Sequence, residues 1–141
     1  MKLEERMLRS VKQRRGNVVL RAELSSMGSA SQVTDVLKAL QSRGVLVRIG
    51  TGIYAKTRVS SVTGAVVPAG SLESLSVEAM TKLGVQVSPS KAAMEYNSGR
   101  TTQVPGSVVL NTGRKRIRRR LSVGGRRLAY ENDIEGAVAI A

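Results

Sequence analysis

The chain has 141 residues, and its 23 lysines and arginines against 10 aspartates and glutamates give a formal net charge of +13. An excess of this size attracts polyanions, so we expect nucleic acid as the partner, with an anionic membrane surface as the rival and plain solubility as the remaining explanation. Cysteine and histidine are absent, which excludes disulfides, thiolate chemistry, zinc fingers and Ser-His-Asp triads.

The first predicted element is an amphipathic helix over residues 2–15, ended by Gly16. Its apolar residues recur at helical spacing, with charged residues between them. They are Leu3, Met7, Leu8 and Val11. We expect one face of this helix to pack on a core while the other stays in water.

A helix-turn-helix pattern follows. Residues 21–24 are predicted as a short helical turn and residues 27–29 as a tight turn, after which Ser29 or Ser31 can cap a helix over residues 30–42. That helix carries an apolar stripe at positions i, i+3, i+4 and i+7 and is followed by a glycine, as is typical of helix ends. The stripe is Val33, Val36, Leu37 and Leu40, and the glycine is Gly44.

Two short β-type runs, at 45–49 and 53–56, flank Gly50-Thr51-Gly52 and predict a hairpin. The order helix, helix, turn, helix, hairpin between residues 2 and 56 is typical of a winged helix. In that fold the third helix enters the major groove of DNA, and the hairpin, or wing, contacts the flanking backbone or the minor groove. Tyr54 alternates with its strand neighbours, and we expect it to pack in the core.

Polar side chains that the apolar stripe leaves on the other faces of the third helix are candidates for DNA contact. Gln32 is the strongest base-reading candidate, because a carboxamide can form two hydrogen bonds with an adenine edge. Ser31 and Thr34 can bond bases or phosphates, and Lys38 is suited to phosphate. The candidates in the wing are Arg48, Thr51 and Lys56. A solvated surface is the alternative for each of them.

Residues 59–70 are rich in Ser, Val, Gly and Pro and predict a linker or an extended connection, whereas residues 72–83 return to a helical pattern. Beyond them we expect a small basic domain with short β segments joined by glycine turns. Its predicted parts are a brief strand at 85–87, a short helix at 90–96, and strands at 107–110, 116–121 and 126–130. The acidic and then small-apolar C-terminal end is expected to be a flexible tail.

No acid occurs between Tyr96 and Tyr130, a span that holds nine lysines and arginines. Within it, Ile117 and Leu121 share strand parity, so they can anchor one face of a strand while arginines project from the other. Arginine is suited to bidentate contact with phosphate. The DNA-contact candidates here are Arg100, Arg114, Lys115, Arg116, Arg118, Arg119 and Arg120. The alternative is a charged β edge that resists aggregation.

No set of residues predicts catalysis. Gly50-Thr51-Gly52 is not followed by the Gly-Lys-Ser/Thr of a phosphate loop, and the ten acids are scattered without a pair at a spacing typical of general acid/base work. We therefore expect no enzyme activity, no cofactor and no metal. No apolar run approaches 18 residues, and the first six residues lack a signal-peptide core, so we expect a cytoplasmic protein without a membrane span.

Several strings between about residues 15 and 130 are typical of one family. They are Ser31-Gln32-Val33, Leu37-Lys38-Ala39-Leu40, Gly44-Val45-Leu46-Val47-Arg48-Ile49-Gly50, Gly52-Ile53-Tyr54-Ala55-Lys56, Ser88-Pro89-Ser90-Lys91-Ala92-Ala93 and Tyr96-Asn97-Ser98-Gly99-Arg100-Thr101-Thr102-Gln103-Val104-Pro105. In these strings the chain resembles AbiE-type antitoxins. The resemblance implies a bacterial autorepressor that binds an inverted repeat near its own promoter and counters a nucleotidyltransferase toxin. Asn97 to Pro105 is either a structural loop or a feature that positions Arg100 on phosphate or toxin.

The sequence thus predicts an α+β protein in four parts. These are a winged helix-turn-helix domain at 1–58, a linker at 59–70, a small α+β domain with a basic β-sheet at 71–131 and a tail at 132–141. The expected function is that of a DNA-binding transcriptional regulator acting on double-stranded DNA, with a homodimer on an inverted repeat. An RNA- or ribosome-associated module, and an antitoxin that binds its toxin directly, remain open.

Overall fold

The computed structural model is of mixed α+β class and describes residues 2–90, 99, 108–114, 117–123, 125–131 and 138–140. The chain divides into two compact units, Met1–Ser71 and Leu72–Ala141, called unit 1 and unit 2 below. The predicted helix at 30–42 is confirmed, and those at 2–15 and 72–83 are confirmed to within two residues at either end.

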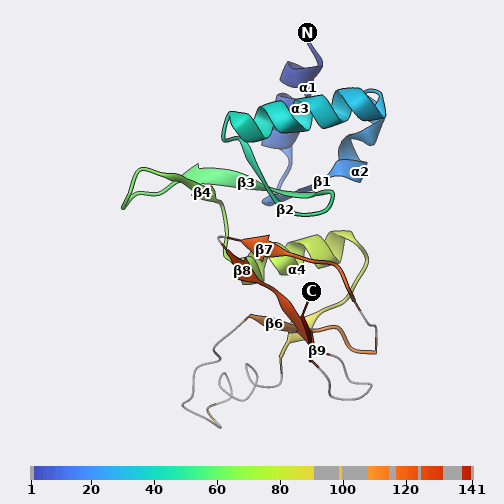
Figure 1. Ribbon diagram of the computed structural model, residues 1–141, viewed down its shortest axis with the longest axis vertical. Helices are drawn as coiled ribbons and strands as arrows, with labels where there is room; N and C mark the ends of the chain where they lie inside the picture. Colours follow the sequence, from blue (N-terminus) through green and yellow to red (C-terminus); the bar gives the residue numbers. More distant parts are fainter. Residues whose placement is uncertain are drawn as a thin grey trace. The chain divides into compact units, whose positions relative to one another are not determined.

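Unit 1 combines helices with an antiparallel sheet (Figure 1). Along the chain its elements are α1 (Leu3–Gln13), β1 (Val18–Leu20), α2 (Arg21–Leu24), the 3-10 turn η1 (Ser25–Met27), α3 (Ala30–Ser42), β2 (Leu46–Gly50), β3 (Ile53–Val59) and β4 (Val66–Pro68). The predicted hairpin is confirmed as β2 and β3, which pair antiparallel.

An aliphatic core holds the helices of unit 1 against its sheet. Met7 and Val11 of α1 and Val33, Leu37 and Leu40 of α3 are all at most 1% exposed, so the apolar stripes of both helices are buried as their spacing predicts. Burying a side chain of this size contributes about 1.5–3 kcal/mol, so these five residues stabilise the packing of α1 against α3. The core is completed by Val19, Leu24, Leu46 and Tyr54, with Leu8 and Val36 packed at its edge.

Both ends of α3 are closed by local hydrogen bonds. At the start, Ser29 is the N-cap, and its hydroxyl accepts a hydrogen bond from the Gln32 backbone N–H at 3.2 Å. At the end, Gly44 takes a φ of +75°, and Val45 N–H donates to the Leu40 carbonyl at 2.9 Å. These signals, all readable from sequence, explain why the predicted bounds of this helix match the structure.

The sheet of unit 1 has the order β1-β3-β2, with β4 paired to the far part of β3. Val18, Val19 and Leu20 stand opposite Ala55, Tyr54 and Ile53. Gly52 turns the β2–β3 hairpin with a φ of +70°, which only glycine adopts easily. Tyr54 is 8% exposed, in agreement with the expectation that it packs in the core.

Within the segment predicted as a linker or an extended connection, residues 59–70, β4 adds a short strand to the sheet. Thr57, Arg58 and Val59 of β3 pair antiparallel with Pro68, Val67 and Val66 of β4. The Ser60 N–H donates to the Ala65 carbonyl at 2.8 Å and so closes the hairpin. A β-hairpin forms here because the Val-rich runs favour strand and Gly64, with a φ of +72°, permits the turn, which composition alone did not reveal.

Unit 2 packs a helix with short strands. Its elements are α4 (Leu72–Lys82), β5 (Ser88–Pro89), β6 (Val109–Asn111), β7 (Ser122–Val123), β8 (Arg126–Arg127), β9 (Ala129–Glu131) and β10 (Val138–Ile140). One sheet has the order β10-β9-β6-β5, in which β6 and β9 are parallel, and β7 pairs with β8. Buried residues include Leu75 and Met80 of α4 and Leu110, Leu128 and Tyr130.

Three predictions for unit 2 are wrong in detail. Residues 85–87 form no strand, because Val85 N–H closes the end of α4 by donating to the Met80 carbonyl. Residues 117–121 form no strand, and β7 begins only at Ser122. The predicted flexible tail contains β10, which pairs with β9. The helix predicted at 90–96 lies, apart from Ser90, outside the described residues.

Candidate nucleic-acid interface

The outward side of α3 is polar and open to solvent. Ser31, Gln32 and Lys38 are exposed and Thr34 is half-buried, so the four residues predicted for DNA contact all reach the surface; we call them the α3 surface. They share it with the exposed carboxylate of Asp35. The charge here is therefore nearly balanced, and the α3 surface offers hydrogen-bonding groups more than electrostatic attraction.

Two of these side chains also build the helix start. Gln32 Oε1 accepts a hydrogen bond from the Ser29 backbone N–H at 3.0 Å, which completes a reciprocal capping box. The Ser31 and Ser29 hydroxyls lie 3.3 Å apart, within hydrogen-bond distance. Gln32 therefore caps the start of α3. A glutamine three residues after a serine is typical of a capping box, but the sequence predictions did not include this role.

Arg21 ties the start of α3 to the tip of the β2–β3 hairpin. Its backbone N–H donates to the Gly52 carbonyl at 2.9 Å, and its Nη2 donates to the Ala30 carbonyl at 2.8 Å. Arg21 thus bonds both the first turn of α3 and the β2–β3 turn. This arrangement places the predicted helix and hairpin contacts on neighbouring parts of unit 1.

The side chains of the hairpin divide into two kinds. Arg48 and Thr51 are exposed, and Arg48 folds back on the turn, with Nε donating to the Gly50 carbonyl at 3.2 Å and Nη2 to Thr51 Oγ1 at 3.4 Å. Lys56 is instead half-buried, and its ammonium donates to the Arg14 carbonyl near the C-terminus of α1. Lys56 thus also has a structural role at the C-terminal end of α1, and its contact with DNA stays a prediction.

In unit 2 the structure exposes Arg118, Arg119 and Arg120 between half-buried Ile117 and buried Leu121. In a strand, Arg119 would lie on the same face as Ile117 and Leu121, yet it is exposed. The predicted alternation of buried and exposed residues therefore fails at Arg119. Like charges on three consecutive residues favour this extended, irregular path over a strand that would turn one of them inward. Arg114 is also exposed, whereas Arg100, Lys115 and Arg116 lie outside the described residues.

A buried tyrosine anchors this arginine segment, defined as residues 118–120. The Tyr130 hydroxyl donates to the Arg119 carbonyl at 2.6 Å, and Tyr130 itself is 2% exposed. Burial raises the pKa of Tyr130 to about 12, partly opposed by the positive charge of Arg119. The protonated hydroxyl donates to the Arg119 carbonyl and so holds the backbone of the arginine segment, and the raised pKa extends this protonated form to higher pH.

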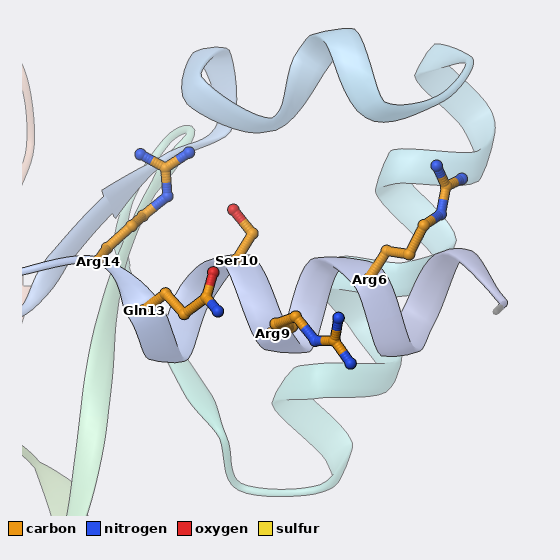
Figure 2. A pocket seen from close by; sticks show the side chains of 5 residues that line it. All are labelled: Arg6, Arg9, Ser10, Gln13 and Arg14. Atoms are coloured by element: carbon orange, nitrogen blue, oxygen red, sulfur yellow. The ribbon is translucent and has the colours of Figure 1, made fainter.

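A cationic group that the sequence predictions did not include lies on α1. Figure 2 shows a shallow hollow lined by Arg6, Arg9, Ser10, Gln13 and Arg14, which we call the α1 arginine face. The signal was available, since residues 6, 9, 10 and 13 are three, four and seven apart and share a side of a helix. Arg6 and Arg9 are exposed, whereas Arg14 is half-buried.

Arg14 is fixed by α2. Its Nη1 bonds Glu23 Oε2 at 3.0 Å and its Nη2 donates to the Glu23 carbonyl at 3.2 Å. The other carboxylate oxygen of Glu23 accepts from the Leu20 N–H at 2.9 Å. Arg14 Nε is buried and has no hydrogen-bond partner in the described part of the chain. The bonds between Arg14 and Glu23 hold the C-terminal end of α1 against α2, beside the exposed arginines of α1.

Positive charge occurs in both units. Residues 1–71 hold twelve lysines and arginines against four acids, and residues 72–141 hold eleven against six. None of the helices in the described ranges has the length and apolar character needed to cross a bilayer. The two units thus form an α+β protein with basic side chains on exposed surfaces and with hydrogen-bonding groups along α3.

Comparison with known proteins places this chain in a family. Residues 4–140 match DUF6088, described as a family of unknown function, and the chain belongs to that family. No curated protein matches the chain.

Proposed function

We propose that this protein binds duplex DNA through a winged helix in unit 1. The order α1-β1-α2-α3-β2-β3 supports this proposal, because a winged helix presents its third helix and its hairpin in that order. The observation that carries it is the link through Arg21, which holds the start of α3 beside the β2–β3 turn. One DNA duplex can then meet both.

In this proposal α3 enters the major groove, with its first turns toward the base edges. Ser31 and Gln32 supply hydrogen-bonding groups near the helix start, and Lys38 is two turns further on, where a phosphate contact is expected. Arg48 and Thr51 at the hairpin reach the flanking backbone or minor groove. The α3 surface therefore supplies sequence preference rather than most of the affinity.

Affinity comes from positive charge elsewhere in the chain, in particular from the arginine segment. Each neutralised phosphate adds about 0.9 to the slope of log affinity against log salt concentration for duplex DNA. Replacing Arg118 and Arg120 with Ala is expected to weaken binding to all duplexes alike and to lower that slope by up to about 2. Equal slopes in wild type and variant would remove the arginine segment from the interface.

We further propose that the protein is a cytoplasmic transcriptional regulator of its own promoter. The resemblance to AbiE-type antitoxins supports this setting, with an inverted repeat as the DNA site and a nucleotidyltransferase toxin as the partner. A nucleotidyltransferase reading frame next to the gene is the expected observation. Co-purification of the two products would favour direct binding of the toxin over control of transcription alone.

The test of DNA binding is a salt-titrated mobility shift with three probes: the duplex upstream of the gene, a scrambled duplex of equal length, and a structured RNA. We expect the upstream duplex to bind about 10³-fold more tightly than the scrambled one or more. Equal affinity for both duplexes would contradict a sequence-specific regulator, and tighter binding of the RNA at matched salt would identify an RNA-binding module instead.

A further inference from the structure

The α1 arginine face is a concentrated group of hydrogen-bond donors. Arg6, Ser10 and Arg14 project from one side of α1, and Arg9 and Gln13 project from the neighbouring side (Figure 2). Neither Arg6 nor Arg9 takes part in the ion pairs formed within the described ranges, which join Arg14 to Glu23 and Arg43 to Glu4. Two exposed guanidinium groups therefore lie beside a hydroxyl and an amide.

Part of this face is turned away from α3. Glu4 bridges to Arg43 just after the C-terminus of α3, with 3.8 Å between Arg43 Nη1 and Glu4 Oε2, so the Glu4 side of α1 lies toward that helix. At about 100° per residue, Arg6, Arg9 and Gln13 lie about 200°, 140° and 180° around α1 from Glu4, whereas Ser10 and Arg14 lie nearer the side of the buried Met7. Arg6, Arg9 and Gln13 thus point away from the surface that α1 shares with α3.

The chemistry of the face suits phosphodiesters. Guanidinium groups form paired, charge-assisted hydrogen bonds with phosphate oxygens, and hydroxyl and amide groups add further donors. The group is open and shallow, which fits a backbone lying across it better than an enclosed small molecule. Glu5 is the exposed acid near Arg9 on α1, so the local excess stays positive.

Building on the proposed DNA binding, we propose that the α1 arginine face binds the phosphate backbone of a second duplex segment, separate from the one that meets α3. One molecule then holds two segments together. Arg6 and Arg9 make the phosphate contacts, and Ser10 and Gln13 orient the backbone. Arg14, fixed by Glu23, positions the hollow.

The test is a capture assay with the full chain, in which bead-bound upstream duplex retains a second, labelled duplex. Wild type is expected to retain the label. The Arg6→Gln/Arg9→Gln variant is expected to lose capture about fivefold or more, while its affinity for a single upstream duplex changes less than about threefold. The control is Lys12→Gln/Arg58→Gln, which removes two exposed charges from outside the face and keeps capture.

The outcomes separate this inference from the proposed function. Specific binding of one duplex with unchanged capture by the Arg6→Gln/Arg9→Gln variant, or with no capture by wild type, overturns the second site and leaves the regulator intact. Capture without sequence preference that depends on Arg6 and Arg9 keeps the second site and overturns the regulator. Equal loss of capture and of single-duplex affinity shows one continuous surface and overturns the second site, and no duplex binding at all overturns both.

Discussion

Gln32 combines two roles that an alanine substitution would confuse. Its Oε1 accepts the Ser29 N–H, which stabilises the start of α3, and its amide is also the strongest candidate for reading a base. A loss of DNA binding in a Gln32→Ala variant would therefore have two explanations. Glutamate separates them, since it keeps the capping oxygen at the same position and lacks the amide donor.

We predict that Gln32→Glu leaves the free energy of unfolding within about 0.5 kcal/mol of wild type, whereas Gln32→Ala lowers it by about 1 kcal/mol. Both variants should lose about 1–3 kcal/mol of preference for the upstream over the scrambled duplex. Denaturant unfolding and binding to the two duplexes measure the two effects. Retained preference in both variants would show that Gln32 only caps the helix.

Tyr130 is expected to make the free energy of unfolding depend on pH. Its pKa is raised to about 12, whereas an unfolded tyrosine ionises near 10, so the folded chain keeps a proton that the unfolded chain has lost between these values. The stability from this difference is fully present below pH 10 and is lost as the pH rises toward 12. It amounts to something on the order of 2 kcal/mol.

We therefore expect the wild-type free energy of unfolding to fall between pH 10 and 12 more steeply than that of a Tyr130→Phe variant. Below pH 9 the variant should be less stable by about 1 kcal/mol, because the Arg119 carbonyl loses its donor. Denaturant titrations across this range test both statements. Parallel curves for the two proteins would show that Tyr130 does not titrate with unfolding.

Among the elements, the bounds of α3 were predictable because its signals are local, although its N-cap stayed open between Ser29 and Ser31. Its apolar stripe lies within the helix, and its N-cap serine and terminal glycine lie directly beside it. The pairings of β4 with β3 and of β10 with β9 join neighbouring segments, with Val59 opposite Val66 and Glu131 opposite Val138, but composition alone, which suggested a linker and a tail, does not show which segments pair. Residues 117–121 lost their predicted strand because three consecutive arginines all need solvent.

The N-cap of α3 is predicted to stabilise unit 1. Ser29→Ala removes the hydroxyl that accepts the Gln32 N–H and should lower the free energy of unfolding by about 1 kcal/mol. Ser42→Ala, at the exposed far end of the same helix, is the matched control and should stay within about 0.5 kcal/mol. Equal effects of the two substitutions, measured by thermal or denaturant unfolding, would contradict the capping role.

Over the whole molecule, uncharged hydrogen-bonding groups and net positive charge lie on different surfaces. The α3 surface carries Lys38 against Asp35, whereas exposed arginines gather on α1 and in the arginine segment. Net charge predicted a polyanion partner, but it could not say where the charge lies. The helical spacing of Arg6 and Arg9 contained that information, whereas the bond of Lys56 to the Arg14 carbonyl could not be predicted because it joins residues far apart in sequence.

The most direct test of the central claim is to map, by nuclear magnetic resonance of the isotope-labelled chain, which backbone amides respond to the upstream duplex. If α3 and the hairpin contact DNA, the amide resonances should shift most at residues 31–38 of α3 and at 50–52 in the β2–β3 turn. Smaller shifts are expected in the arginine segment. Shifts confined to unit 2, or absent from α3 at saturating duplex, would contradict a winged helix that reads DNA.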